Sequence, residues 1–163
     1  MMKVFVVYDT KYGNTKLVAE KIVEGLREAK GIETAISDVK DVDTKAVAGS
    51  EVILIGAPNH MGRPAGTIVK FIDDLSKMDL KGKWAAVFDT YLGGDFEKAV
   101  KKMEKRISDK VPNMKLISPG LSVRVNGMKG PIAEGELPKC VDFGRKIANQ
   151  LKTPQTLEKV GLN

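Results

Sequence analysis

Apolar residues along the chain gather in short runs that are separated by polar turns. The runs 4–8, 52–57 and 84–88 are continuous, which is typical of strands that are covered on both faces of a sheet. Segments 33–38 and 121–125 alternate apolar and polar residues instead, which is typical of half-exposed edge strands. The pattern therefore predicts five strands, three of them buried and two at the edges.

Between the strands, apolar residues recur every three or four positions, as on the buried face of an amphipathic helix. A further short helix is expected at 44–48. Strands that alternate with helices predict an α/β fold, a doubly wound parallel sheet with helices on both faces. The order 2-1-3-4-5 places the two alternating strands at the edges. The predicted helix faces comprise Val18, Ile22 and Leu26; Ile68, Phe71, Ile72 and Leu75; Phe96, Val100, Met103 and Ile107; and Val141, Gly144, Ile147, Ala148 and Leu151.

The chain of 163 residues has room for one such domain, which we expect over 1–151, followed by a frayed tail at 152–163. Its apolar share is 42%, and no apolar run approaches the roughly 20 residues of a membrane span. The first residues run directly into a strand and lack the pattern of a signal peptide. A cytoplasmic protein without membrane insertion is expected.

The single cysteine, Cys140, excludes an intramolecular disulfide and a Cys-x-x-Cys motif. The single histidine, His60, excludes a metal site with several histidines, and no metal is expected. Any electron chemistry of this chain therefore needs a cofactor.

Residues 6–22, VVYDTKYGNTKLVAEKI, read as a strand, a polar turn and the start of a helix. The free N–H groups and the dipole of such a helix N-terminus favour a bound anion. The turn lacks the Gly-Lys-Ser/Thr ending of a Walker A loop, and only Gly13 of the dinucleotide fingerprint is present. The sequence thus indicates a phosphate-bearing ligand on a different kind of loop.

This segment resembles the N-terminal signature of the flavodoxins, and the wording of 8–15 is most similar to the flavodoxin domain of flavodiiron proteins. The matching positions are Val6, Val7, Tyr8, Thr10, Gly13, Thr15, Ala19 and Ile22. The resemblance implies the flavodoxin-like fold and FMN as the cofactor, with its phosphate on this first loop. In the order 2-1-3-4-5, ligands bind at the carboxyl ends of strands 1 and 3, where this loop lies.

The resemblance further implies that two more loops hold the two sides of the isoalloxazine ring. No catalytic residue is expected, and Gly62 is the candidate for a backbone flip that the family uses when the flavin gains a proton. The expected cofactor-binding residues are Thr10, Lys11, Tyr12, Gly13, Asn14 and Thr15; Pro58, Asn59, His60, Met61 and Gly62; and Thr90, Tyr91, Leu92, Gly93 and Gly94.

The third loop departs from the family pattern, in which a glycine precedes the hydroxyl residue and a tryptophan follows the tyrosine. Here Asp89 occupies the glycine position and Gly93 the tryptophan position. Trp84 begins a strand and lies about 16 Å from the ligand end, so it cannot replace the missing ring. Tyr91 is therefore the expected stacking aromatic. In the first loop, Tyr12 stands where short-chain flavodoxins favour threonine.

The resemblance implies an electron carrier between redox partner proteins. An FMN-dependent NAD(P)H:acceptor (quinone-type) oxidoreductase is the alternative, although no nicotinamide fingerprint is present. A nucleotide-sensing domain stays open, whereas a phospho-receiver would need an aspartate at the end of the third strand, which reads 55–58 IGAP.

The net charge of +6 differs from the acidic character of most flavodoxins. Lysines concentrate in 98–105 and 110–115, either as a solvated helix face or as a docking site for acidic redox partners. Nucleic acid is not expected as a partner, because these runs carry few aromatic residues and match no binding module. The sequence leaves the oligomeric state open.

Overall fold

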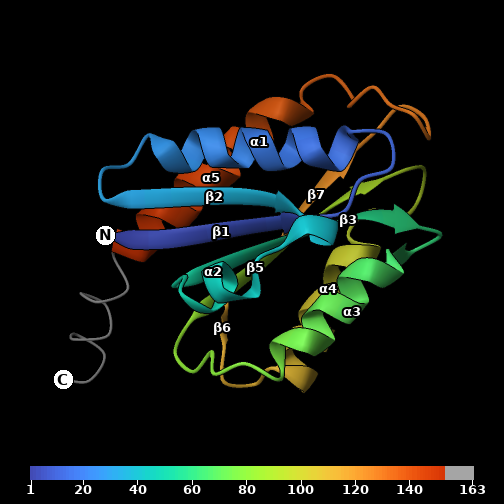
Figure 1. The fold of residues 1–163 in the computed structure, drawn as a ribbon. Helices are drawn as coiled ribbons and strands as arrows, with labels where there is room; N and C mark the ends of the chain where they lie inside the picture. The colour runs from blue at the N-terminus through green and yellow to red at the C-terminus, as the bar shows by residue number, and fades with distance from the viewer. Residues whose placement is uncertain (153–163) are drawn as a thin grey trace.

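The computed structural model describes residues 1–152, in which a parallel sheet lies between two layers of helices (Figure 1). The strands are β1 (Met2–Tyr8), β2 (Ile32–Asp38), β3 (Val52–His60), β4 (Arg63–Pro64), β5 (Trp84–Tyr91), β6 (Lys115–Leu116) and β7 (Leu121–Arg124). The helices are α1 (Asn14–Arg27), the 3₁₀ turn η1 (Val39–Asp41), α2 (Thr44–Ala48), α3 (Gly66–Leu75), α4 (Lys98–Lys110) and α5 (Glu136–Lys152). Helices α1 and α5 cover one face of the sheet, and α2, α3 and α4 cover the other.

The sheet has the order β2-β1-β3-β5, and β6 and β7 share the position next to β5. The predicted order is therefore confirmed, with one refinement: the fifth strand consists of two short pieces. The pairing register advances by two residues between them, because segment 117–120 bulges out of the ladder. Pro119 has no N–H to donate there, and a Cβ on Gly120 would lie 2.5 Å from the Val87 carbonyl oxygen.

Burial follows the predicted pattern. The three central strands are buried on both faces, whereas edge strand β2 has no buried residue. One apolar core lies between the sheet and the α1–α5 layer, and a second lies between the sheet and the layer of α2, α3 and α4. The central strands are continuously apolar because a layer of helices covers each face of the sheet, as the sequence predicted.

Two positions of the predicted helix faces are wrong. Phe96 is 54% exposed because α4 begins only at Lys98, so the aromatic ring lies in the preceding loop. On α5, Val141 is only half-buried, and Phe143 is buried in the core. The helix faces of α1 and α3 are confirmed.

Helices α1 and α5 pack closely through glycine. A Cβ on Gly144 of α5 would lie 2.1 Å from the Ile22 carbonyl oxygen of α1, and one on Gly25 would lie 2.0 Å from the Val141 carbonyl oxygen. Any side chain at these positions would push the two helices apart.

The predicted domain boundary falls within the last turn of α5, which runs to Lys152. The remainder of the predicted tail, 153–163, lies outside the described residues. None of the helices within 1–152 is both long enough and apolar enough to cross a membrane.

Candidate functional site

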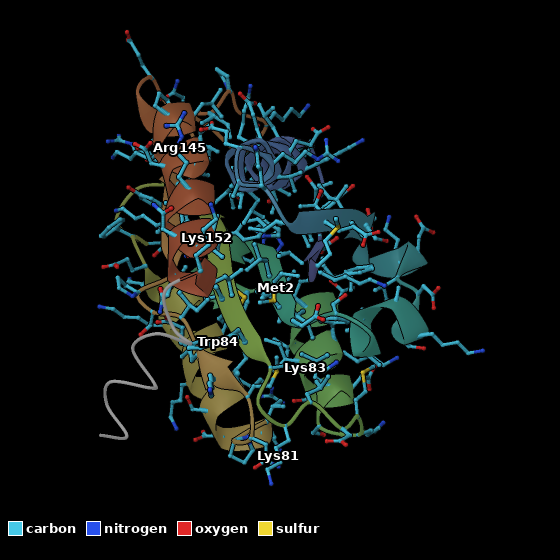
Figure 2. All side chains as sticks on the ribbon, turned by 90° about the vertical axis from the view of Figure 1, so that its left-hand side faces the viewer. Met2, Lys81, Lys83, Trp84, Arg145 and Lys152 are labelled. Carbon is cyan, nitrogen blue, oxygen red and sulfur yellow. The ribbon has the colours of Figure 1, made fainter. Side chains whose placement is uncertain are left out.

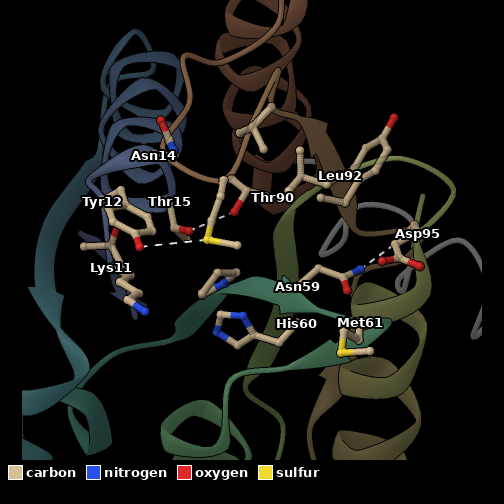
Figure 3. Close-up of a pocket in the computed structure, with 15 residues that line it drawn as sticks. Lys11, Tyr12, Asn14, Thr15, Asn59, His60, Met61, Thr90, Leu92 and Asp95 are labelled. Atoms are coloured by element: carbon tan, nitrogen blue, oxygen red, sulfur yellow. Dashed lines mark hydrogen bonds between the residues drawn. The ribbon is translucent and has the colours of Figure 1, made fainter.

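The carboxyl ends of β1, β3, β5 and β7 meet at one edge of the sheet, and the segments that follow them enclose a cavity of about 410 Å³ (Figure 3). All three predicted loops contribute to its wall, together with a fourth segment. The lining residues are Thr10, Lys11, Tyr12, Asn14, Thr15, Pro58, Asn59, His60, Met61, Thr90, Tyr91, Leu92, Asp95, Val125 and Met128. Four predicted residues shape the turns but do not line the cavity: Gly13, Gly62, Gly93 and Gly94.

The first loop bends sharply between β1 and α1. Gly13 has a φ of 92°, and its N–H donates to Thr10 Oγ1 at 2.9 Å. No side chain caps α1, so its first N–H groups depend on another partner. Thr15 is buried, and its hydroxyl lies 3.0 Å from the hydroxyl of Thr90 on β5 (Figure 3). This bond ties the first loop to the third.

The second predicted loop is a β-hairpin. Strand β3 extends to His60 and β4 pairs back onto it, which leaves a two-residue turn of Met61 and Gly62 with φ values of 54° and 86°. Both signs match a type I′ turn, which is unusual for a methionine. The Gly62 N–H donates to Asn59 Oδ1 at 2.7 Å, and Asn59 Nδ2 donates to the Asp95 carbonyl at 3.0 Å. Asn59 thereby joins the hairpin to the third loop.

The third segment begins while β5 is still in the sheet. Thr90 is buried, and Tyr91 meets Phe96 edge-on, with 5.4 Å between ring centroids and 66° between ring planes. Tyr91 also lines the cavity, so it stays the candidate aromatic for a flat ligand.

A fourth segment, which follows β7, closes the cavity against the first loop. Tyr12 donates its hydroxyl to the Met128 sulfur at 3.9 Å, and Lys129 Nζ lies 5.9 Å from the Tyr12 ring centroid. Val125, Met128 and Asp95 line the cavity although no sequence pattern indicated them. The rule that ligands bind at strand carboxyl ends applies to the fifth strand as well and could have found the fourth segment.

Asp89 lies directly behind this wall. It is completely buried, and burial raises the pKa of its carboxyl from 3.8 to about 6, although hydrogen bonds from Ser122 and the Val100 N–H lower it. The Ser122 hydroxyl is 2.6 Å from Oδ1 and the Val100 nitrogen is 3.1 Å from Oδ2. At the position where the family pattern has a glycine, this chain therefore has a buried carboxyl group.

The comparison with known proteins decides the family. The family model described as "Flavodoxin domain" matches residues 5–122. The chain belongs to the flavodoxin family. A flavodoxin of Clostridium saccharobutylicum is 29% identical over 163 residues, covering 93% of this chain and 98% of that protein. A flavodoxin of Aquifex aeolicus is 34% identical over 93 residues, which are 55% of this chain and 50% of that protein.

Solved flavodoxins have the same fold. A flavodoxin structure from the domain Archaea has a TM-score of 0.79 at 27% identity and covers 93% of this chain and 99% of its own. The type A flavoprotein fprA of Rhodobacter capsulatus is 26% identical, and this chain covers only 32% of it. The predicted family, the FMN cofactor and the electron-carrier function are confirmed by these flavodoxin relatives.

The residues present fit FMN as the family's cofactor. The cavity lies within the usual size range of ligand pockets, and it combines an uncapped helix N-terminus with apolar walls. Cys140 is buried in α5, and burial raises the pKa of its thiol to about 12, so it offers no covalent link to a flavin. Residues 1–152 hold no cluster of three or more potential metal ligands.

Trp84 lies at the opposite edge of the sheet, as predicted. Figure 2 looks onto the amino ends of the strands and shows Trp84 on the same side as Met2 and Lys83. Lys115 Nζ lies 5.1 Å from its ring centroid. This tryptophan belongs to the packing of the far edge and not to the flavin site.

Proposed function

We propose that this flavodoxin-family chain binds FMN non-covalently in the cavity, with the phosphate at 10–15. The observation that carries the proposal is the N-terminus of α1, which opens onto the cavity without a side-chain cap. Its N–H groups and the hydroxyls of Thr10 and Thr15 supply donors to a phosphate, and Lys11 supplies a positive charge.

The isoalloxazine ring would lie between the hairpin and the third segment. Pro58 and Met61 offer apolar contacts on one side, and Tyr91 and Leu92 offer them on the other. Met128 would cover the ring or ribityl chain from the fourth segment. When bound, FMN supplies the electron storage that no side chain of this chain provides.

The rim of the cavity supports a carrier that meets other proteins. Five of the seven large hydrophobic side chains that residues 1–152 expose gather at or beside its mouth: Tyr12, Met61, Leu92, Phe96 and Met128. Exposed apolar patches of this kind mark docking surfaces. The proposed carrier would receive and deliver electrons across this rim, and its working location is proposed to be the cytoplasm.

The chemistry next to the rim favours an acidic partner. A basic groove of about 440 Å³ lies beside the hairpin, lined by Arg63, Pro64, Val69, Lys102, Lys105, Arg106, Asp109 and Lys110. Lys105 pairs with Asp109 at 2.7 Å, and Arg106 pairs with Asp73 at 2.6 Å. Within residues 1–152, Arg63 and Lys102 form no ion pair, so they can meet a partner's carboxylates.

Lys98 is the first residue of the lysine run 98–105, which the sequence indicated as a candidate docking site. In the structure, Lys98 Nζ lies 3.2 Å from Asp95, so part of its charge is already balanced. The ammonium of Lys102 lies beside Gly62 of the hairpin, 3.9 Å from the position of an added Cβ. We therefore assign the leading role in docking to Lys102 and Arg63.

The test of the cofactor is direct. Heat should release FMN from the purified protein, identified by mass, and FMN should bind more tightly than riboflavin in calorimetry because only FMN carries the phosphate. Equal affinities would refute the phosphate site. Steady-state oxidation of NADH or NADPH by the FMN-loaded protein alone would point to the reductase alternative, whereas a carrier oxidises neither at a useful rate.

A further inference from the structure

Asp89 is a buried carboxyl that the proposed binding role of the cavity does not use. It lies on β5 next to Thr90, yet it does not line the cavity itself. Burial of an ionised carboxyl costs folding free energy, and hydrogen bonds from neighbouring donors offset part of that cost. Its bonds lead in two directions, directly to α4 and through the start of α4 to the hairpin.

The first direction is helix α4, which has no cap of its own. Its N-cap residue, Glu97, has a φ of 61° and makes no side-chain cap bond. The Val100 N–H in the first turn donates to Asp89, and the Glu97 N–H donates at 2.9 Å to Ser122, which in turn donates to Asp89. Asp89 and Ser122 therefore cap α4 from two neighbouring strands.

The second direction is the hairpin. The Lys98 N–H at the start of α4 donates to the Asp95 carbonyl at 3.1 Å, and the Asn59 side chain of the hairpin donates to that same carbonyl. The Asn59 side chain also accepts the Gly62 N–H and so holds the hairpin turn. Figure 3 shows Asn59 and Asp95 joined across the gap between the hairpin and the third segment. Asp89 thus caps the start of α4, and the start of α4 holds the Asp95 carbonyl to which the hairpin is bound.

We propose that ionised Asp89 is a positioning residue for FMN, which holds the hairpin turn and the start of α4 in the arrangement that forms the cavity. This inference rests on the proposed binding of FMN in that cavity. The geometry of the FMN site would then depend on whether the Asp89 carboxyl carries a proton.

The direction of the pH dependence follows from the donors. An ionised carboxylate only accepts hydrogen bonds, and the Ser122 hydroxyl and the Val100 N–H both donate to Asp89. Protonation of Asp89 would add a third donor to these two. Glu97, which precedes α4, acts on the carboxyl as a negative charge and raises the pKa further. With a pKa of about 6, the positioned form dominates at pH 7 and becomes the minor form at pH 5.

The first experiment measures the dissociation constant of FMN between pH 5 and pH 8 by quenching of flavin fluorescence. When only the ionised form is competent, affinity falls about tenfold from pH 7 to pH 5. The FMN phosphate also titrates near pH 6, so the informative quantity is the difference from Asp89→Asn. That variant should bind FMN more weakly than wild type at pH 7. Its affinity should also lack the part of the pH dependence that comes from the titration of Asp89. The control Asp109→Asn changes the same charge at the far end of α4 and should keep the wild-type profile.

The second experiment uses the protein without FMN and follows backbone amides by ¹⁵N–¹H NMR in phosphate-free buffer. Gly62 and Val100 should titrate together with a midpoint near pH 6 in wild type and Asp109→Asn. If Gly62 does not follow Val100, or if Asp89→Asn keeps the wild-type FMN profile, the inference is wrong. If Asp89→Asn does not fold, the wild-type amide titration decides alone. Failure of the cavity as the FMN site would show instead as absent or phosphate-independent binding in wild type.

Discussion

Replacing Thr15 with valine tests the phosphate site at its most buried hydroxyl. The substitution keeps the volume and branching of the side chain and removes one oxygen. In the structure Thr15 is 1% exposed, Thr90 is 5% exposed, and their hydroxyls are 3.0 Å apart. The change therefore has two consequences, one for the fold and one for the ligand.

For the fold, Thr15→Val leaves the buried Thr90 hydroxyl without its partner, which costs about 1 to 3 kcal/mol of unfolding free energy. For the ligand, the lost hydrogen bond to a charged phosphate contributes about 1.5 to 3 kcal/mol, so the affinity for FMN should fall roughly tenfold to a hundredfold. The double variant with Thr90→Val removes both hydroxyls and should recover much of the stability, because no unpaired polar group remains. It should not recover FMN affinity.

Urea unfolding of the FMN-free protein and calorimetric titration with FMN measure the two consequences separately. Thr44→Val is the matched control, because Thr44 also begins a helix but lies outside the cavity. The reasoning is refuted if Thr15→Val binds FMN as tightly as Thr44→Val does. In that case the Thr15 hydroxyl serves only the bond to Thr90.

Three further predictions follow from burial, packing and charge. Since burial raises the pKa of Asp89 from 3.8 to about 6, the folded protein holds this proton more tightly than the unfolded chain. Its share of the unfolding free energy should therefore fall by about 2 kcal/mol as pH rises from 4 to 7; urea unfolding should show this fall in wild type and not in Asp89→Asn. Gly144→Ala should lower the unfolding free energy by about 1 to 3 kcal/mol or more through the clash with α1, whereas Gly66→Ala, where a Cβ meets nothing within 4 Å, should be nearly neutral. Lys102→Glu should slow stopped-flow electron transfer with an acidic donor protein at low salt, and Lys30→Glu, the same charge change on a distant loop, should not; rates that ignore both salt and Lys102→Glu would contradict the acidic-partner proposal.

The loss of stability on ionisation of Asp89 and its proposed role in positioning FMN have the same cause, the buried negative charge. At neutral pH the buried charge lowers the stability of the fold, and the same charge accepts the donors that organise the cavity. Positions that reduce stability in this way are typical of binding sites. The difference in unfolding free energy between Asp89→Asn and wild type should therefore shift in favour of the variant from pH 5 to pH 7, while FMN binding weakens.

Local patterns in the sequence determined most of the fold. A strand covered on both faces has no position for a polar residue, so the three central strands were visible as continuous apolar runs. The helices were visible from their period, and the two alternating runs indicated which strands lie at the edges. The phosphate loop was also visible, because strand, glycine turn and helix start lie within one short segment at 6–22.

Only the tertiary structure decided how distant segments meet. No turn signal such as Asn-Gly marks Met61 and Gly62 as a hairpin, and the bonds of Asn59 to Gly62 and Asp95 become visible only in three dimensions. The exposure of Phe96 depends on where α4 begins, and Asp89 helps to fix that start through Val100, 11 residues away, and Ser122, 33 residues away. Sequence periodicity reports which face of an element is buried, but the partner of a buried polar group is chosen by close packing between elements, which no local pattern encodes.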